Sequence, residues 1–504
     1  MGLSWADNPA GYCQLLHKPP PAPTIQPSKK GYPYMRRTVR VCLIVLVACV
    51  ATAFLVVAWL WQSPQVQGLR DEANNRSPHE LIRYLKKRLQ GHNKLEAVFL
   101  PPLQAAQRRY ERTPPAGPLP NLGKGQQARA LAEPVIGTTT LLPVSSPQTI
   151  RQALLDAQPG TRIVIAPGLY PFQTKLRLGH GGTARAPIVL SAAQPGTVRF
   201  AFAQVEGILV DQPHWVFENL HIRGTCARHD DCEHAFHVVG RGEFTTLRNN
   251  YIQDFNAHIK VNGYNGDWPD HGRLAYNTLT NTAPRETMRS VVPFDLVGAN
   301  AWKVQDNLVS NFAKRDGNMV SFGIFMKGAS EGGRIERNLV ICSPHDISRP
   351  GVRVGISFGG GGTDPGVCRD KRCDAYEHRL GLAANNIVAH CNDIGLDVNH
   401  SSQITLAHNT LINTSGIGAR NAPAQAKMYG NLYEGVAKFR DGAQASVTMN
   451  ETMNALDTFM DADALLLQWR RPPERIPRLD FLPHDFDNRA RGQGTLPGAL
   501  DGPK

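Results

Sequence analysis

The sequence predicts an all-β protein: a right-handed parallel β-helix with an N-terminal capping helix, preceded by a single transmembrane helix and a helical stalk. Two observations predict the β-helix. Short apolar segments, each opened by one asparagine, recur at steps of 19 to 48 residues, and recurrence at about 20–50 residues is the signature of a solenoid. Between the asparagines, apolar and polar residues alternate without a helical period, as in strands and tight turns.

The recurring asparagines mark one corner of each expected coil. They are Asn219, Asn250, Asn277, Asn307, Asn338, Asn386, Asn409, Asn431 and Asn450. Stacked asparagines can hydrogen-bond along the axis of a solenoid, and Asn tolerates the left-handed backbone of a turn. We therefore expect one ladder of asparagines along the molecule, with uneven loops on one side.

The net charge of +13 belongs mostly to the N-terminal part of the chain. Residues 1–134 hold 18 Lys+Arg and 7 Asp+Glu, which leaves 37 and 35 for the remainder, a net charge of only +2. The solenoid is therefore nearly neutral, and its charge gives no argument for binding nucleic acid.

Residues 41–61 form an uncharged apolar run that is long enough to cross a bilayer once. Basic residues precede this run, and Trp59 and Trp61 end it, as at a membrane interface. We expect an inner-membrane protein with a cytoplasmic N-terminus and the bulk of the chain in the periplasm. A cleaved signal peptide is the alternative, but its best small-residue site, Ala51-Thr52-Ala53, lies in the middle of the run.

Composition divides the rest of the chain. Ser77 begins a capping box, which predicts a helix over 78–90, and a second helix is expected over 103–112. Pro and Gly gather over 113–134, as in a linker. The expected divisions are a disordered cytoplasmic tail (1–40), the transmembrane helix (41–61), the stalk and linker (62–134), the β-helix (135–455) and an extended C-terminal segment (456–504).

The folded domain opens with SSPQTIRQALLDAQPGTRIVIAPGLYPF, which predicts a capped amphipathic helix followed by a strand over 162–166. Such a helix can cover the open end of a solenoid core. This opening, with APIVLSAAQPGTVRF and WVFENLHIRG, resembles the pectate-lyase-like superfamily of right-handed β-helix proteins. The segments DFNAHIKVNG and FGIFMKGAS are similar to a bacterial β-helix family without an established activity. The superfamily resemblance implies the β-helix fold and acidic polysaccharides as the favoured ligands. It does not imply one reaction, because lyases, hydrolases, esterases and adhesins share this fold.

Six cysteines follow the apolar run, an even number that indicates disulfides in an oxidising compartment. Cys226–Cys232 and Cys368–Cys373 would close short loops, and Cys342–Cys391 would join neighbouring coils. The alternative for the first pair is a zinc site that uses His229 or His234.

One strand of each coil carries the candidate site. Six segments align, HAFHVVG, AHIKVNG, VPFDLVG, FGIFMKG, VGISFGG and IGLDVNH. Their apolar positions must point inward, so the residues between them face solvent. The outward column consists of His237, Lys260, Asp295, Phe325, Ser357 and Asp397. We expect His258 and Asn262 beside Lys260, Lys327 beside Asp295, and two walls formed by loops 264–271 and 359–378.

These residue types fit two kinds of chemistry. We assign Lys260, Asp295, Lys327 and His258 as catalytic candidates and His237, Asn262, Tyr264 and Trp268 as substrate-binding candidates. In a β-elimination, Lys260 would be the base, and Lys327 or a Ca²⁺ ion held by Asp295 would neutralise the uronate carboxylate. A glycoside hydrolase would need a second carboxylate from a loop, such as Asp267, Asp270 or Glu331, because Asp295 and Asp397 are roughly 14 Å apart at the spacing of parallel strands.

The sequence therefore favours a membrane-anchored periplasmic protein that binds an acidic polysaccharide and cleaves it by β-elimination. The alternatives are a hydrolase on the same fold and a non-catalytic carbohydrate-binding or envelope scaffold protein. The plain alternative for Lys260 and Asp295 is a cross-strand salt bridge. No dedicated metal ligands are expected beyond the candidate Ca²⁺.

Overall fold

The computed structural model describes residues 92–110, 112–131, 135–360 and 363–502, together with Ile82, Leu85, Lys86 and Leu89. The expected tail and transmembrane helix over 1–61 lie outside the described residues. Within the described part, no helix combines the length and apolar character that a membrane crossing requires.

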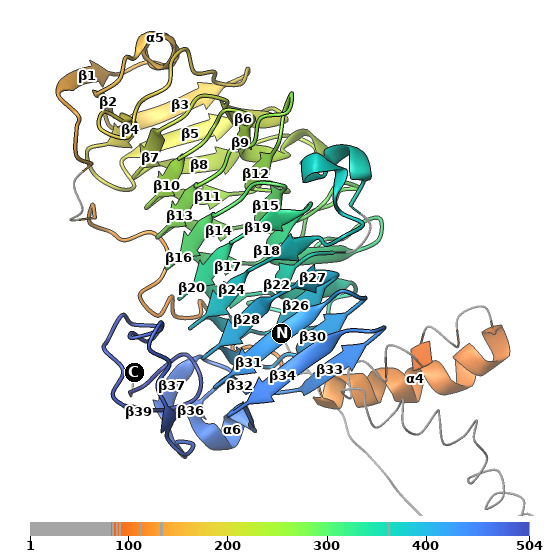
Figure 1. Cartoon of the computed structure of the whole chain (residues 1–504). Helices are drawn as coiled ribbons and strands as arrows, with labels where there is room; N and C mark the ends of the chain where they lie inside the picture. The colour runs from red at the N-terminus through yellow and green to blue at the C-terminus, as the bar shows by residue number, and fades with distance from the viewer. Residues whose placement is uncertain are drawn as a thin grey trace, which may run out of the picture. The chain divides into compact units, whose positions relative to one another are not determined.

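Three parallel sheets, A, B and C, stack coil upon coil, so the parallel β-helix is confirmed (Figure 1). In spatial order, sheet A contains β1 (Thr140–Val144), β2 (Thr161–Ile165), β4 (Ile188–Ala192), β7 (Trp215–Glu218), β10 (Thr246–Arg248), β13 (Arg273–Ala275), β16 (Lys303–Gln305), β20 (Arg334–Glu336), β24 (Leu382–Ala384), β28 (Ile404–Ala407), β31 (Gln425–Tyr429) and β34 (Gln444–Thr448). Each strand pairs with the strand one coil away, as a solenoid requires.

Sheet B follows sheet A around each coil. It contains β3 (Gly168–Phe172), β5 (Val198–Phe202), β8 (His221–Gly224), β11 (Tyr251–Gln253), β14 (Thr278–Thr280), β17 (Leu308–Ser310), β21 (Leu339–Ile341), β25 (Ile387–Ala389), β29 (Thr410–Ile412), β32 (Leu432–Tyr433) and β35 (Glu451–Thr452). The asparagine ladder lies at the corner between these two sheets.

Sheet C carries the candidate site. It contains β6 (Glu206–Val210), β9 (His234–Val239), β12 (Ile259–Asn262), β15 (Phe294–Val297), β18 (Val320–Lys327), β22 (Val352–Phe358), β26 (Leu396–Asn399), β30 (Gly416–Arg420) and β33 (Val436–Arg440). A short sheet of β19 (Ser330–Glu331), β23 (His378–Arg379) and β27 (Ser401–Ser402) lies beside it.

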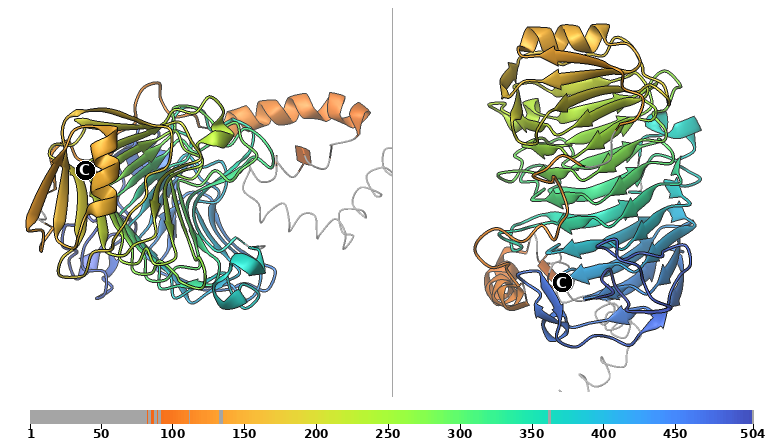
Figure 2. Two further views of the ribbon diagram at one scale, coloured as in Figure 1. Left: turned by 90° about the horizontal axis from the view of Figure 1, so that it is seen from above. Right: turned by 90° about the vertical axis from the view of Figure 1, so that its left-hand side faces the viewer.

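The helix α5 (Pro147–Asp156) closes the N-terminal end of the stack, as the sequence predicts (Figure 2). Ser146 caps it, because its hydroxyl accepts a hydrogen bond from the Thr149 amide at 3.1 Å. Ile150 and Leu154 are fully buried and continue the core of the coils. The end of the apolar core is thereby shielded from water.

The asparagine ladder forms from Asn250 onward. Each backbone amide from Asn250 to Asn431 donates to the Oδ1 atom of the next ladder asparagine, at 2.8 to 3.0 Å. Asn219 is an exception, because Leu220 occupies the ladder position and its amide donates to Asn250 Oδ1 at 3.0 Å. Asn219 lies one residue earlier at φ 64°, and the residue before the ladder position has a positive φ in the other coils too, as Asn249 and Asp306 show. The left-handed backbone expected of the ladder asparagines therefore belongs to the residues that precede them.

The segment before the solenoid differs from the expected stalk and linker. One helix, α4 (Asn93–Tyr110), covers residues 103–110 of the helix predicted over 103–112, begins ten residues earlier and contains Pro101 and Pro102. Ile82, Leu85, Lys86 and Leu89, within the predicted helix over 78–90, are helical.

Residues 113–131 of the predicted linker, together with Arg112, instead lie against the coils, and we call residues 112–131 the strap (Figure 1). Lys124 is 5% exposed, and its Nζ contacts Asp306 at 2.9 Å and the Phe486 carbonyl at 2.6 Å. A buried lysine without such partners would be costly, so these contacts fix the strap in one position.

The C-terminal segment also packs on the solenoid. It contains α6 (Ala455–Thr458), the pair β36 (Phe459–Asp461) and β37 (Leu466–Trp469), and the pair β38 (Ile476–Pro477) and β39 (Gly494–Thr495). Its apolar residues, including Phe459 and Phe486, cluster with Ile387 and Leu432 of sheet B. The segment predicted as extended is therefore a cover for part of sheet B.

Candidate active site

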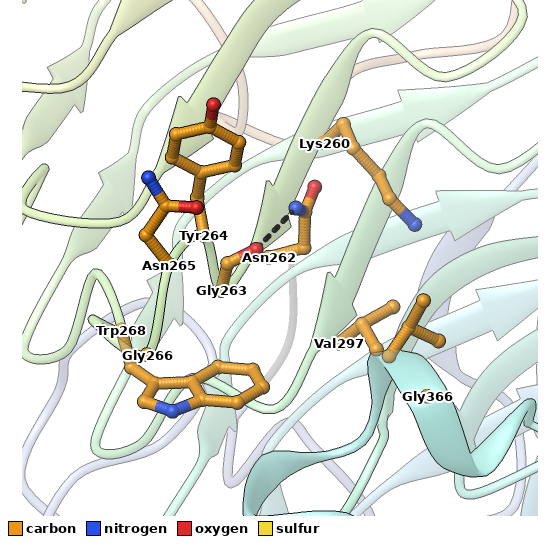
Figure 3. Close-up of a pocket in the computed structure, with 10 residues that line it drawn as sticks. Lys260, Asn262, Gly263, Tyr264, Asn265, Gly266, Trp268, Val297 and Gly366 are labelled. Carbon is orange, nitrogen blue, oxygen red and sulfur yellow. Dashed lines mark hydrogen bonds between the residues drawn. The ribbon is translucent and has the colours of Figure 1, made fainter.

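A cavity of about 360 Å³ lies on the outer face of sheet C, and we call it the Lys260 groove. It is lined by Lys260, Asn262, Gly263, Tyr264, Asn265, Gly266, Trp268, Val297, Gly366 and Val367. Figure 3 shows Tyr264 and Trp268 on one side of the groove and Val297 and Gly366 on the other. Both loops that were predicted as walls contribute residues.

The predicted outward column has the predicted register. In the register of the parallel strands, His237 lies beside Lys260, Lys260 beside Asp295, and Asp295 beside Phe325. Phe325 in turn pairs with Ser357, which pairs with Asp397. The flanking apolar residues on these strands are buried to within 1% exposure. Alternation of side chains across a parallel strand therefore places Lys260 and Asp295 side by side on the outer face.

Asp295 is the centre of the charged cluster. Its carboxylate receives Lys260 Nζ at 2.5 Å on Oδ2 and faces Lys327 Nζ at 3.7 Å on Oδ1. Burial raises the pKa of Asp295, but the two ammonium groups outweigh burial and lower the pKa to about 2. Two cations on one anion leave this cluster with a net charge of +1.

Lys327 is the less constrained of the two lysines. The ammonium of Lys327 lies 4.3 Å from the centre of the Phe325 ring, a weak cation–π contact. The distance of 3.7 Å to Asp295 is too long for a hydrogen bond. Its side chain is 20% exposed, so Lys327 can donate to an anionic ligand without first breaking a short ion pair.

His237 and Asn262 extend the cluster into the preceding coil. The ring of His237 lies 2.9 Å from Glu206 Oε1 through Nδ1 and 2.8 Å from Asn262 Oδ1 through Nε2. Both ring nitrogens are thus engaged by side chains, which fixes the orientation of the ring. The hydrogen bond from His237 and the ammonium of Lys175 help to lower the pKa of Glu206 to about 2, against the effect of its burial. Asn262 Nδ2 donates to the Gly263 carbonyl, so the orientation of its amide is fixed.

His258 does not belong to the groove, contrary to the prediction. Its side chain is fully buried, and its Nε2 lies 2.8 Å from the Thr280 carbonyl. Burial lowers its pKa to about 4, so the ring is neutral and structural at pH 7. His258 lies one position before the strand β12 begins, where the alternation that orients Lys260 does not apply.

Three residues near the cluster were missed by sequence reasoning. Glu206 lies on β6, one coil before His237, and contacts the His237 ring at 2.9 Å. Glu233 forms an ion pair with Arg289 at 2.6 Å. The ring centre of His234 lies 5.1 Å from that of His237. Burial lowers the pKa of His234 to about 3 and raises the pKa of Glu233. Only His234 carried a sequence signal, as a candidate zinc ligand.

The zinc alternative is wrong, because Cys226 and Cys232 form a disulfide. Cys342–Cys391 and Cys368–Cys373 also form disulfides, so all three predicted pairs are confirmed. No group of three or more potential metal ligands occurs in the described part of the chain. Asp295 also fits Ca²⁺ poorly, because its oxygens already face two ammonium groups and Ca²⁺ requires a shell of 6–8 oxygens.

We predicted that the outward column forms one continuous exposed strip, and this prediction is wrong. Phe325 is 4% exposed, Ser357 is fully buried, and Asp397 is 1% exposed and paired with Arg420 at 2.8 Å. Gly360 packs directly on the Phe325 ring, where an added Cβ would lie 2.4 Å from Cζ. The accessible part is therefore limited to Lys260, Lys327 and their neighbours on earlier coils.

Two loops form the walls and are tied to each other. Arg369 donates to both carboxylate oxygens of Asp270 at 2.8 and 2.9 Å. Trp268 lies against Gly263 and Gly298, where a Cβ would come within 2.6 and 2.0 Å of its ring. These contacts hold the indole as part of the wall, whereas Tyr264 is 63% exposed and can stack on a sugar ring.

The loop carboxylates considered for a hydrolase are engaged elsewhere. Asp270 binds Arg369, and Glu331 pairs with Arg379 at 2.6 Å and accepts a hydrogen bond from Tyr376 at 2.6 Å. Neither lines the groove, nor does Asp267.

Comparisons with known proteins find similarity in solved structures alone. No family model matches the chain, and no curated protein matches its sequence. The pectate lyase Pel9A has a TM-score of 0.46 at 13% identity, over 73% of this chain and 97% of the lyase. A rhamnogalacturonan lyase has a TM-score of 0.43 at 13% identity, over 66% and 94% of the two chains. The GH136 lacto-N-biosidase from Eubacterium ramulus has a TM-score of 0.41 at 14% identity, over 62% and 68%. Two lyases and a lacto-N-biosidase are thus among the solved structures to which this chain is similar.

Proposed function

We propose that this protein binds an acidic polysaccharide in the Lys260 groove and cleaves it by β-elimination. One observation carries the proposal. The ammonium of Lys260, which lines the groove, and that of Lys327, which lies outside its lining, both face the single buried carboxylate of Asp295. The surplus positive charge is local, in a solenoid that is almost neutral as a whole.

Lys327 is the residue that neutralises the uronate carboxylate in this proposal. Its ammonium makes no short hydrogen bond to Asp295 and is held over Phe325. A carboxylate that approaches Lys327 forms a charge-assisted hydrogen bond, which is stronger than one between neutral groups. A neutralised carboxylate also makes the neighbouring C–H more acidic, the first requirement for elimination.

Lys260 is the proposed base. It starts in an ion pair with Asp295 at 2.5 Å, so it must release its own proton to solvent before it can accept one from the sugar. The neutral amine then takes the proton α to the carboxylate, a C=C bond forms, and the C–O bond to the leaving sugar breaks. The returned proton goes to the leaving oxygen.

The remaining groove residues bind the sugar ring. The exposed ring of Tyr264 offers an apolar face, and Asn262, which contacts His237 behind the groove, forms a fixed polar edge beside Lys260. Aromatic faces and a few oriented polar groups are typical of small-ligand sites.

A non-catalytic carbohydrate-binding role is the second candidate. The observation in its favour is the short ion pair between Lys260 and Asp295, which keeps the proposed base protonated in the resting protein. Both candidates share the same ligand class and the same groove.

The test is to incubate the full chain with a panel of uronate polymers and to follow ultraviolet absorbance and new reducing ends. Elimination yields an unsaturated product, so absorbance and reducing ends rise together, and Lys260→Ala abolishes both. Reducing ends without absorbance would establish a hydrolase instead. Binding without any product would establish the non-catalytic role.

We also propose that residues 41–61 anchor the chain in the inner membrane, with the solenoid in the periplasm. The three disulfides support an oxidising compartment. The test is to expose cells with a permeabilised outer membrane to protease, which should remove the solenoid; protection of the solenoid would contradict the proposal.

A further inference from the structure

We infer that the Lys260 groove is closed toward the C-terminal coils and receives the end of a saccharide chain, not an internal segment. This inference rests on the proposed function, because it specifies how the same acidic polysaccharide enters the groove.

The outer face of sheet C is blocked immediately after Asp295. On the next three coils the outward residues are Phe325, Ser357 and Asp397, and none is more than 4% exposed. Gly360 covers the Phe325 ring at a distance that leaves no room for a side chain. A saccharide that follows the axis of the solenoid therefore cannot continue past Lys327.

The barrier is the loop over residues 363–377, and this loop is anchored at several points. Buried Glu377 accepts hydrogen bonds from the Thr363 hydroxyl at 2.7 Å and the Gly328 amide at 2.9 Å. The Cys368–Cys373 disulfide closes the loop on itself. A loop held in this way is a fixed wall in the described structure.

Arg369 joins this loop to the opposite wall. Its guanidinium binds Asp270 through two hydrogen bonds and the Gly298 carbonyl through a third at 3.1 Å. The Cζ atom of the Arg369 guanidinium also lies 5.4 Å from the centre of the Trp268 ring. The two loops thus meet and close the groove on the side of Trp268.

The opposite side of the groove, toward the N-terminal coils, is open. His237 is 19% exposed, Lys175 is 34% exposed, and Arg289 is 45% exposed in their side chains. Each of these side chains contacts Glu206 or Glu233, so this side of the groove is a partly exposed surface of paired polar groups. The volume of about 360 Å³ is near the lower limit of the roughly 300–1,000 Å³ found for ligand sites, so the enclosed part suits a short chain end.

Length dependence of binding tests the inference. Calorimetry of the full chain with oligogalacturonates and oligomannuronates, from monomer to octamer, should show an affinity that rises to the dimer or trimer. Beyond that length the affinity should change by less than about twofold for each added residue, because added residues contact only the rim.

Arg369→Ala supplies the decisive variant. Loss of the bond to Asp270 should open the closed side, so the affinity should continue to rise at lengths where the wild type has reached its plateau. Arg349→Ala is the matched control, since this exposed arginine pairs with Asp346 at 3.5 Å outside the groove and should leave the plateau unchanged. Unchanged melting temperatures confirm that both variants fold.

An affinity that rises steadily to the octamer in the wild type would overturn the closed groove while leaving acidic saccharide binding intact. A plateau at the same length in Arg369→Ala would show that the wall does not set the limit, and would also overturn the inference. Absence of binding to every oligomer would instead refute the proposed function.

Discussion

Replacement of Asp295 by Asn removes the anion that two lysines share while keeping the size of the side chain. The carboxylate is 5% exposed, and its pKa in the folded protein is about 2, against an ordinary value of 3.8. That difference corresponds to about 2 kcal/mol of stability at neutral pH. We therefore expect Asp295→Asn to lower the free energy of unfolding by about 2 kcal/mol at pH 7.

The pH dependence of this loss identifies its cause. Because the pKa of Asp295 is lower in the folded state, the carboxylate stabilises the fold above about pH 4, and this contribution disappears as the pH falls to about 2. Urea unfolding followed by circular dichroism, with the disulfides kept oxidised, measures the difference between wild type and variant at pH 7 and through the acid range.

Asp480→Asn is the control, because that carboxylate is 98% exposed and its removal should change stability by less than about 0.5 kcal/mol. A loss for Asp295→Asn that stays constant from pH 7 to pH 2 would refute the charge argument, since it would show that packing alone accounts for the effect.

Three further perturbations follow from the same contacts. Asn307→Ala should cost about 2–4 kcal/mol in urea unfolding, because it leaves ladder partners buried and unpaired. Exposed Asn93→Ala should cost little, and equal costs would contradict a ladder contribution. Lys124→Met should release the strap and speed proteolysis between residues 112 and 131, which mass spectrometry of the fragments measures. Cleavage at the wild-type rate would show that the ion pair between Lys124 and Asp306 does not hold the strap. Gly298→Ala should weaken oligouronate binding by about tenfold because its Cβ would displace the Trp268 ring. Gly332→Ala, which has a similar positive φ but open space, controls for backbone strain, and equal losses of binding would exclude the Trp268 explanation.

Much of the fold follows from local sequence rules. Because side chains alternate along a strand, the sequence predicts that Lys260 and Asp295 both point outward. Because the strands stack in parallel, residues that align between the repeated segments are also neighbours in the sheet. The cysteine pairs followed for the same reason, since spacing from the asparagines placed Cys342 and Cys391 on neighbouring coils.

The errors arise where long-range packing overrides those rules. Asn219 matched the asparagine pattern, but the ladder position in that coil belongs to Leu220. Phe325 and Asp397 occupy outward positions, yet Gly360 of the next coil covers Phe325 and Arg420 pairs with buried Asp397. Alternation carries no information about such covers. Lys124 shows the same limit, because its burial depends on Asp306, far away in sequence.

The site itself was predictable only in part. Lys260, Asp295 and Lys327 come together because they lie on three successive strands. Glu233 and Arg289 come from connections between strands, whose paths no repeat determines. The prediction that His258 belongs to the groove is wrong, because His258 lies just before β12, the strand that orients Lys260.

Comparison of one uronate polymer with its carboxyl-reduced, neutral counterpart tests most directly whether the Lys260 groove recognises an acidic saccharide. The full chain should bind the uronate polymer and bind the reduced polymer at least about tenfold more weakly, and Lys327→Met should remove that difference. Equal affinity of the wild type for the two polymers, or a preference that survives in Lys327→Met, would contradict recognition through this lysine.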